Sequence, residues 1–542
     1  MTSVLSLGLL IALPLVLTKL TKDFIDRRNS PLAELRGPPR KTLFSGRRRD
    51  PFSSDNIQVR TAKWAEEYGS VYKTTTALGW TIVVLCDPKA IAHFHAKDGT
   101  TYARLPFLNT LTEAMMGPNM LSADKEQHQR LRRSVAPAFS NAALRGLTSV
   151  FYDSVYKVKA NWDALLQSSN DSDGVILDVQ DWFDSVGIAG FGHDFRSLDG
   201  EQSPVLEVFT LFSNILESAT FILFVLTGFY FPQVVKAPVK PARLLKKLKE
   251  ATSDIAKQLL ENSNKEEGAS DTTMDRSIIG VLLRAQSGKA KLSHDELLGQ
   301  GSFLFAGYET TSSKCMVQYM YPVALISTYA VVLSWALVEL ARHADIQKRL
   351  REESHQDSGS EPSWDQLMSS FPYLDAVVHE TLRLHPPAEE MMRVADEDDT
   401  IPPSQPLKLA SGKTVDSVFI PKGTVLNSPF LYINCCEAFW GPDPEQFVPE
   451  RWLTDNPYPP KELVGHRQLY TFSDGPRMCL GKGFALAELK VALLVLVRNF
   501  TFELPDGPDT EIQVHRLSIL PRPKVAGEVG CSLPMKIKPV AN

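Results

Sequence analysis

Cysteine is scarce in this chain, which has six cysteines among 542 residues. None of them forms a Cys-x-x-Cys pair or stands at a zinc-finger spacing from histidine, so the common zinc-binding patterns are excluded. This usage is typical of a protein from a reducing compartment. The adjacent Cys435 and Cys436 are predicted to fill the core at the edge of a strand.

A surplus of positive charge is also missing. The chain has 58 Lys and Arg residues against 63 Asp and Glu residues, and its formal net charge is -5. A polyanionic partner such as nucleic acid is therefore not indicated. Hydrophobic residues make up 43% of the chain, which is enough for a substantial core in one large domain or several.

The apolar run at the N-terminus is short. Residues 4–17 carry no charged side chain, whereas a bilayer span needs about 20 residues. Basic residues follow this run, which is the reverse of a cleaved secretory signal. The order predicts a retained membrane anchor over residues 1–20 with a cytoplasmic body. A basic linker and proline hinge follow over residues 21–50 and include Gly37-Pro38-Pro39.

One stretch near the C-terminus carries a strong chemical signal. Residues 472–481 place Cys479 between two glycines, behind an arginine and before an apolar helical run. Backbone N–H groups, a cation and a helix N-terminus all favour a thiolate that binds haem iron. For the short Gly-x-Arg-x-Cys-x-Gly pattern alone, a buried core cysteine is an equal alternative. The full spacing Phe-x-x-Gly-x-Arg-x-Cys-x-Gly closely resembles the haem-binding loop of the cytochrome P-450 family.

This resemblance implies that Cys479 is the axial ligand of the haem iron. It also implies that Phe472, Gly475, Arg477 and Gly481 form the haem-binding loop, with Arg477 as a ligand of a haem propionate.

A predicted helix over residues 127–135 places His128 and Arg132 on one face. A solvated basic helix is the alternative interpretation. The segment is similar to the family helix whose Trp/His-x-x-x-Arg pattern contacts a haem propionate, which implies that role for His128 and Arg132. Arg130 points away from that face and is a candidate contact for an acidic redox partner.

Ser293 to Glu296 form a predicted capping box that opens a helix. The helix reaches Ala-Gly-Tyr-Glu-Thr-Thr at residues 306–311, which is similar to a pattern in the family's long central helix. The resemblance implies that Ala306 and Gly307 leave room for O₂ over the iron, and that Glu309 and Thr310 deliver protons. Without Cys479, a threonine pair in a helix has no special meaning.

A further predicted helix over residues 373–384 contains Glu380 and Arg383, three residues apart. At a surface, such a pair would contribute only about 0.2–0.5 kcal/mol. The match to the family's Glu-x-x-Arg helix implies instead a buried network of Glu380, Arg383 and Arg451 that supports the haem loop. Arg393, on the strand after this helix, resembles another propionate ligand.

The motifs occur in the family's order from about Pro38 to the C-terminus. The resemblance implies a single, mainly α domain with a small β portion over residues 51–542, the cytochrome P-450 fold, which carries haem b at the cytoplasmic face of the endoplasmic reticulum membrane. Residues 71–75 and 81–86 predict a small hairpin sheet, and residues 177–280 are predicted to be mostly helical. No glycine-rich dinucleotide fingerprint stands in a βαβ context, so no flavin domain is fused. Electrons are therefore expected from NADPH through a separate reductase.

The activity implied by the resemblance is monooxygenation, in which one oxygen atom of O₂ enters a small apolar substrate as a hydroxyl group. The closest resemblance is to fungal microsomal members, whose substrates include terpenoids, polyketides and other secondary metabolites. A haem-thiolate desaturase or isomerase, or an inactive haem-binding membrane protein, remains open. The candidate pocket consists of Phe107, Leu108, Phe303 and the segment after Pro387, where Glu389 and Glu390 are expected to face solvent.

The chain departs from the family pattern after Thr311. Residues 312–332 separate Thr311 from Leu333-Ser334-Trp335-Ala336, where family members need only about three residues. As one helix, residues 294–343 would be about 75 Å long and would contain Pro322 in the interior. Two hypotheses explain residues of about 313–330: a genuine insertion near the distal pocket, or a translated in-frame intron.

Overall fold

The structure is a computed structural model. It describes residues 30–39, 57–75, 81–169, 173–180, most of 221–265, 293, 295–296, 328–355, 361–453, 463, 465–515, 521–528 and 532–540. The predicted anchor, the residues Ala306, Gly307, Glu309 and Thr310, the pocket candidate Phe303 and most of the predicted insertion lie outside these residues. Within the described ranges, no helix is both long and apolar enough to cross a membrane.

The chain divides into two compact units. The first comprises Met1–Ala103, Glu390–Ile433 and Lys461–Val464, and the second comprises Arg104–Glu389, Asn434–Pro460 and Gly465–Asn542. Helices predominate among the described residues, with a smaller share of strand, which confirms the predicted composition of the fold.

The first unit contains a five-stranded sheet with the order β1-β2-β10-β5-β3. β1 and β2 pair antiparallel, with Val71 opposite Leu85, which confirms the predicted hairpin. Alternating apolar residues and β-branched residues favour a half-buried strand, and this explains why the hairpin could be predicted locally. The strands of the sheet are β1 (Val71–Thr75), β2 (Thr81–Leu85), β3 (Tyr102–Ala103), β5 (Met391–Ala395) and β10 (Val425–Ser428).

Helices and short strands outside this sheet complete the first unit. Asp87 caps α3, because its Oδ1 accepts hydrogen bonds from the backbone N–H groups of Lys89 at 3.0 Å and Ala90 at 3.1 Å. α2 ends before Gly69, whose φ of 105° suits glycine. The elements are η1 (Pro31–Glu34), α2 (Ile57–Tyr68), α3 (Pro88–Ala96), β6 (Asp399–Ile401), β7 (Leu407–Lys408), β8 (Thr414–Val415) and β9 (Val418–Ile420).

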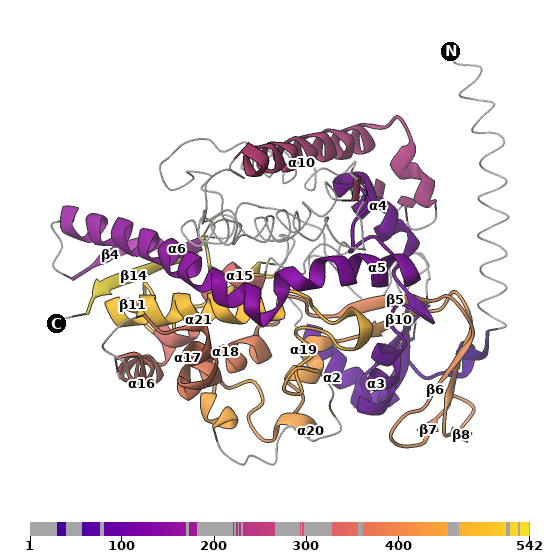
Figure 1. Cartoon of the computed structure of the whole chain (residues 1–542). Helices are drawn as coiled ribbons and strands as arrows, with labels where there is room; N and C mark the ends of the chain where they lie inside the picture. Colours follow the sequence, from indigo (N-terminus) through magenta and orange to yellow (C-terminus); the bar gives the residue numbers. More distant parts are fainter. Residues whose placement is uncertain are drawn as a thin grey trace. The chain divides into compact units, whose positions relative to one another are not determined.

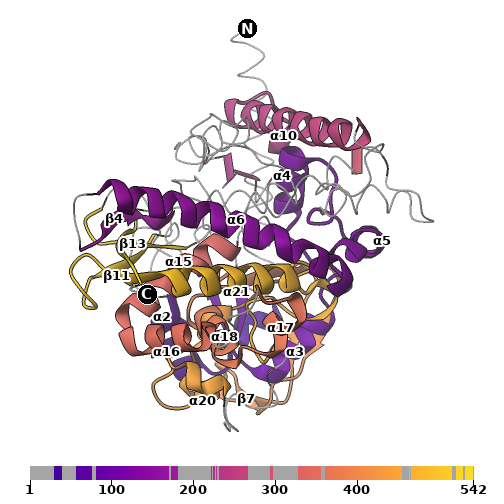
Figure 2. The ribbon, with the colours of Figure 1, turned by 60° about the vertical axis from the view of Figure 1, so that its left-hand side comes forward.

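The second unit is built around α21 (Lys482–Asn499), whose residues from Leu486 to Val497 are all buried. A helix that is apolar on every side must lie inside the core. Its main neighbour is α6 (Asn141–Ser168), which runs beside it in both views (Figures 1 and 2). The rings of Phe151 and Phe484 meet edge to face at 4.9 Å between centroids. Since α21 starts three residues after Cys479, this core fixes the chain that follows the cysteine.

The second unit contains further helices. Ser293 and Glu296 exchange the hydrogen bonds of the predicted capping box. The helices are α4 (Pro106–Met116), α5 (Lys125–Val135), η3 (Ala136–Phe139), η5 (Pro232–Lys236), α10 (Lys240–Lys265), α15 (Thr328–Arg342), α16 (Ala344–Ser354), α17 (Trp364–Ser369), α18 (Pro372–Leu384), α20 (Glu437–Trp440), η6 (Pro449–Trp452) and η7 (Gly475–Arg477). α19 (Phe430–Asn434) joins the two units along the chain.

Two sequence predictions need correction here. Leu177 and Asp178, the first residues of the region predicted to be mostly helical, instead end β4 (Val175–Asp178), which pairs with β14 (Pro534–Pro539) beside β11 (Phe500–Glu503). β12 (Ile512–His515) and β13 (Arg522–Val525) pair separately. Cys435 and Cys436 lie in the turn between α19 and α20 rather than at a strand edge, although Cys435 is buried as expected.

Candidate functional site

The loop before α21 holds Cys479 in a tight series of turns. The backbone N–H of Cys479 donates to the carbonyl of Phe472 at 2.9 Å, and the N–H of Met478 donates to Gly475 at 3.0 Å. Ser473 and Gly475 adopt φ values of 59° and 70°, a conformation that suits glycine and costs free energy at serine. The Cys479 side chain is buried just before the N-terminus of α21.

The electrostatic surroundings of Cys479 oppose the effect of its burial. Burial raises the pKa of the Cys479 thiol to about 11, while the backbone N–H groups of Gly481 and Lys482 lower it, together with the charges of Arg132 and Lys482. All of these groups favour negative charge on sulfur. A metal ion would complete the deprotonation, because a coordinating thiol binds as thiolate.

Arg132 and His128 reach this region from α5. Burial lowers the pKa of the Arg132 guanidinium, and the nearby Cys479 is the group that acts in the opposite direction. Among the described residues, Arg132 has no hydrogen-bond acceptor and no carboxylate partner. His128 lies one turn away on the same helix and is 6% exposed. The structure therefore brings Arg132 and Cys479 together, with His128 on the same helix.

Arg477 lies inside the loop and is buried. Its Nη2 donates to the carbonyl of Ala123 at 2.9 Å and to Oδ1 of Asp124 at 3.1 Å. These bonds tie the cysteine loop to the residues that precede α5. Arg477 is thus placed between the two segments that carry Cys479 and Arg132.

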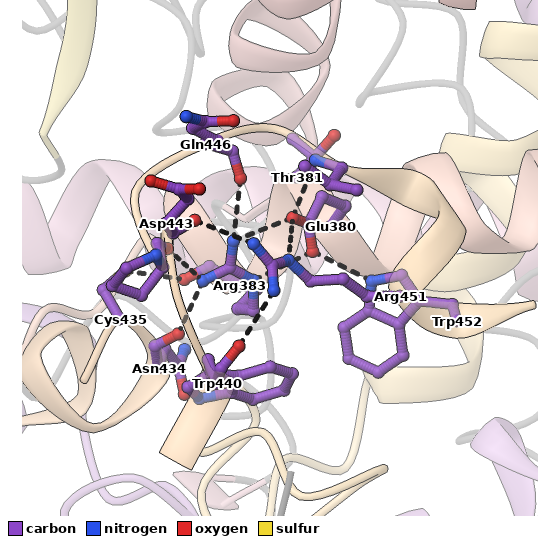
Figure 3. A network of polar contacts seen from close by, with 12 residues as sticks. Glu380, Thr381, Arg383, Asn434, Cys435, Trp440, Asp443, Gln446, Arg451 and Trp452 are labelled. Atoms are coloured by element: carbon purple, nitrogen blue, oxygen red, sulfur yellow. Dashed lines mark hydrogen bonds and ion pairs between the residues drawn. The ribbon is translucent and has the colours of Figure 1, made fainter. Parts of the chain in front are cut away.

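Glu380 and Arg383 form a fully buried pair on α18 (Figure 3). Nε of Arg383 donates to Oε2 of Glu380 at 2.8 Å, and Nη2 donates to Oε1 at 2.7 Å. The other guanidinium hydrogens reach the carbonyl groups of Asn434, Pro444 and Gln446. A buried ion pair needs this kind of complete hydrogen bonding to offset the cost of desolvation.

Arg451 joins the same pair from η6. Its Nε lies 3.5 Å from Oε1 of Glu380, and its Nη1 donates to the carbonyl of Trp440 at 2.8 Å. The indole N–H of Trp452 donates to Oε2 of Glu380 at 2.9 Å. The structure therefore brings Glu380, Arg383 and Arg451 into one network (Figure 3).

Asn434 connects this network to the cysteine loop. Its carbonyl accepts from Arg383, its Nδ2 donates to Oγ1 of Thr471 at 2.9 Å, and its Oδ1 accepts from the backbone N–H of Tyr470 at 3.3 Å. Oγ1 of Thr471 in turn donates to the carbonyl of Leu382 at 2.8 Å. Thr471 precedes Phe472, so α18 is fastened directly to the start of the loop.

Arg393 belongs to the first unit and is paired there. Its Nε and Nη2 donate to the two carboxylate oxygens of Asp98 at 2.7 Å and 2.9 Å, and Nη1 donates to the carbonyl of Met392 at 2.9 Å. Asp98 is completely buried. The sequence did not indicate this partner.

The guanidinium of Arg130, a candidate contact for a redox partner, pairs with Glu296 in the second unit, while 45% of the Arg130 side chain stays exposed. That role therefore remains a prediction. One other expectation differs from the structure. Glu389 and Glu390 were expected to face solvent, yet they are 4% and 5% exposed. Oε2 of Glu390 accepts from Nδ2 of Asn427 at 3.0 Å. A charge pattern in the sequence cannot show burial that distant segments create.

The donor set around Cys479 fits a haem. A buried thiol with N–H donors and cations can act as a thiolate ligand of iron. A half-buried guanidinium that has no acceptor among the described residues suits an anionic carboxylate of a porphyrin. His128, Arg132 and the loop from Phe472 to Gly481 are thus the residues that could hold the group.

Comparisons with known proteins agree with this chemistry. The family model described as "Cytochrome P450" matches residues 38–317 and 323–526. Cytochrome P450 monooxygenase claQ of Ampulloclitocybe clavipes is 45% identical over 518 residues, which cover 93% of both chains. Cytochrome P450 monooxygenase claW of the same fungus is 42% identical and covers 95% of this chain and 94% of its own length.

A more distant relative from another fungus also spans the whole chain. Cytochrome P450 monooxygenase 205 of Postia placenta is 29% identical over 551 residues, with 97% of this chain and 96% of that protein covered. The family model matches the larger part of the sequence, and the motifs around Cys479 and Arg383 lie inside the match. The chain therefore belongs to the cytochrome P450 family of monooxygenases.

Proposed function

We propose that this protein is a haem-thiolate monooxygenase that inserts one oxygen atom of O₂ into a small apolar organic substrate as a hydroxyl group. The observation that carries the proposal is the buried thiol of Cys479, surrounded by the N–H groups of Gly481 and Lys482 and by the charge of Arg132. When bound, haem b supplies the activation of oxygen. Cys479 would hold the iron, and His128, Arg132, Arg393 and Arg477 are candidates to bind the propionates.

Each remaining part of the site has a role in this proposal. The loop residues Phe472, Gly475 and Gly481 shape the turn around the thiolate. The Glu380–Arg383–Arg451 network supports that turn through Asn434 and Thr471. Ala306 and Gly307 would leave room for O₂, and electrons would come from NADPH through a separate reductase.

The function is tested by expressing the chain in microsomes together with an NADPH-dependent reductase. We expect NADPH-dependent oxidation of a substrate found by difference spectra against a compound library, and incorporation of ¹⁸O from labelled O₂ into the product. A product that lacks the label would instead indicate a desaturase or an isomerase. Fungal secondary metabolites such as terpenoids and polyketides are the first compounds to screen.

Glu309 and Thr310 are proposed to deliver protons during oxygen activation. Thr310→Ala should increase the ratio of NADPH consumed to product formed, because the ordered proton route is lost and peroxide is released. Thr310→Ser keeps the hydroxyl group and should stay close to the parent. Equal coupling in parent and Thr310→Ala would remove Thr310 from the mechanism.

We propose an anchor over residues 1–20 and a catalytic body on the cytoplasmic side of the endoplasmic reticulum membrane. The sequon at Asn499 is a poor reporter of this topology, because Asn499 ends α21 and its Nδ2 donates to the carbonyl of Val495 at 2.7 Å. Gly412→Asn creates a sequon with Thr414 in an exposed turn, where a Cβ meets no atom within 4 Å. The φ of 87° at Gly412 strains a side chain there, although Asn adopts this region more readily than most residues. We expect no glycan at this site, and a glycan there would place the body in the lumen.

The residues of about 313–330 are proposed to be an extra segment, and the retained-intron hypothesis is favoured. The family model leaves out residues 318–322, within this segment. Deleting about eighteen residues between Ser312 and Leu333 should restore a continuous central helix and raise turnover. Detection of a peptide from residues 316–329 in the native, active protein would contradict the intron hypothesis.

A further inference from the structure

A chain of polar side chains runs from α18 to the residue that begins α21. Nε2 of His379 lies 3.3 Å from Nε2 of His466, and Nδ1 of His466 lies 3.4 Å from Nζ of Lys482. At the other end, Nδ1 of His379 lies 2.7 Å from the backbone carbonyl of Asp375. All four residues belong to the second unit, and the proposed function gives no role to the side chains of Asp375, His379 and His466.

The geometry allows a single arrangement of protons. A carbonyl oxygen only accepts, so Nδ1 of His379 carries a hydrogen and Nε2 of the neutral ring is an acceptor. Nε2 of His466 must then donate to His379, which leaves Nδ1 of His466 as an acceptor. An ammonium only donates, and Lys482 is the donor that faces this nitrogen.

Both imidazoles are in the neutral form that this arrangement requires. Burial lowers the pKa of His379 to about 4, although Asp375 acts in the opposite direction. Burial, together with the charges of His379, Lys482 and Arg467, lowers the pKa of His466 to about 3. Both values lie well below neutral pH, so the tautomers are fixed by their hydrogen bonds.

The backbone around His466 is held in a strained turn. Arg467 and Gln468 adopt φ values of 51° and 61°, and the N–H of Leu469 donates to the carbonyl of His466 at 3.0 Å. Two successive left-handed residues other than glycine cost free energy. Oδ2 of Asp375 binds Nη1 of Arg467 at 2.6 Å and offsets this cost. The turn therefore presents the His466 ring to His379 and Lys482.

Lys482 follows Cys479 by three residues, and its backbone N–H is hydrogen-bonded to the thiol. Its charge and its backbone N–H both lower the pKa of the Cys479 thiol. The ring of His466 also packs edge to face against Phe472 of the cysteine loop, at 6.1 Å between centroids. His466 is thus in contact with both the loop and the lysine that follows it.

We propose that His466 and His379 are positioning residues that hold the Lys482 ammonium beside Cys479, and that this fixed charge raises the reduction potential of the haem iron. The inference rests on the proposed function, because it takes Cys479 as the iron ligand. Reduction of a bound haem iron by one electron would lower the charge at the iron by one. A nearby fixed cation favours the product of that step.

Two substitutions at His466 test its hydrogen bonds to His379 and to Lys482 separately. In His466→Asn, Oδ1 takes the place of Nδ1 and still accepts from Lys482, but no atom reaches His379. In His466→Gln, the amide reaches His379 in place of Nε2, but no acceptor faces Lys482. Lys482→Met removes the charge and keeps the length of the side chain.

The test is an equilibrium redox titration of the purified holoenzyme, with haem content and the carbon-monoxide spectrum recorded for every variant. We expect Lys482→Met and His466→Gln to lower the equilibrium constant for reduction about tenfold, which is about 59 mV for a one-electron couple. His466→Asn should stay within about twofold of the parent. If His466→Gln fails to hold haem, His379→Leu should show the drop, because the His466 ring, unlike an asparagine at that position, needs His379 to hold the tautomer whose Nδ1 accepts from Lys482. His379→Gln keeps an acceptor for His466 and is the control.

The outcomes distinguish the proposed function, in which Cys479 binds the iron, from the proposed role of Lys482 and the two histidines. A parent without the long-wavelength Soret band would refute Cys479 as the ligand, and the further inference would fall with it. A parent with that band, and with unchanged potentials in Lys482→Met and His466→Gln, would overturn only the further inference. The further inference would also be overturned if Lys482→Met lowered the potential and His466→Gln did not. The histidines would then not position the Lys482 charge.

Discussion

Cys435 and Cys479 are both buried in the second unit, and burial raises the pKa of both thiols, yet the groups beside the two sulfur atoms differ. Burial raises the pKa of Cys435 to about 12; Arg383 acts against this effect, whereas the nearby Glu380 and Glu445 act in the same direction as burial. Its Sγ donates to the carbonyl of Arg383 at 3.8 Å, which requires the proton. Cys479 instead receives N–H groups and positive charge. The neighbours of a cysteine, rather than its burial, thus distinguish a candidate ligand from a residue that fills the core.

Each cysteine also has an arginine nearby, and the two arginines differ in the same way. Glu380 neutralises Arg383 through two hydrogen bonds, and backbone carbonyls occupy the remaining donors. Arg132 has no carboxylate partner in the part of the chain that the structure describes. The charge of Arg132 therefore remains to act on Cys479 and on an anionic group bound beside it.

The largest effect on stability is expected from breaking the buried Glu380–Arg383 ion pair, which lies beside Cys435. Arg383→Met leaves the Glu380 carboxylate buried without its main partner and should lower the free energy of unfolding by about 3–5 kcal/mol. Urea denaturation followed by circular dichroism measures this change. Arg145→Met is the matched control, because the Arg145–Asp365 pair is exposed and should contribute nothing measurable. Similar midpoints for both variants would show that the buried network does not stabilise the fold.

The next effect concerns the arginine beside Cys479. Arg132→Met should weaken the hold on a haem carboxylate by about 1.5–3 kcal/mol, or roughly 10- to 100-fold in the rate of haem loss. Transfer of haem to apomyoglobin measures that rate. Arg132→Lys should restore part of the retention, and Arg133→Met on the exposed neighbour should leave the rate unchanged. Equal rates in Arg132→Met and the parent would remove Arg132 from the haem site.

A pH effect is expected from His379, which precedes Glu380 on α18 and whose ring meets that of His466. Its pKa is lowered to about 4 by burial in the folded state, while the unfolded side chain titrates near 6.5. Between these values the unfolded chain binds more protons, so stability is full above about pH 6.5 and falls as the pH decreases toward 4. The loss attributable to His379 between pH 7 and pH 5 should be about 2 kcal/mol. His379→Gln cannot titrate, and its urea midpoint should therefore fall less than that of the parent over this range.

The smallest effect is expected at Cys435 itself. Cys435→Ala removes a buried sulfur that has no proposed chemical role, and should cost about 1 kcal/mol. Its carbon-monoxide spectrum should match that of the parent. A loss of the long-wavelength band in Cys435→Ala would break the contrast between the two cysteines.

Local patterns predicted the parts of the fold that depend on nearby residues. The β1–β2 hairpin, the capping box at Ser293 and Glu296, and the helix that carries Glu380 and Arg383 all follow from short segments. The sequence around Cys479 likewise predicted a turn followed by an apolar helix, and the structure has η7 and α21 there. These features need few contacts with distant segments, and their physical causes can be read from a short window of sequence.

Contacts between distant segments could not be predicted. Arg393 meets Asp98 across 295 residues, and Arg130 meets Glu296 across 166 residues. β4 forms a strand because β14, near the C-terminus, pairs with it. The buried positions of Glu389 and Glu390, and the hydrogen bonds from His379 to Lys482, depend in the same way on tertiary packing. Propensity and charge pattern carry no information on such pairings.

The most direct test of the account is the carbon-monoxide spectrum of the reduced protein in Cys479→Ala and Cys435→Ala, prepared side by side. We expect the parent and Cys435→Ala to show the long-wavelength Soret band typical of thiolate ligation. Cys479→Ala should lack this band, whatever haem it retains. Persistence of the band in Cys479→Ala would contradict the assignment of Cys479 as the iron ligand.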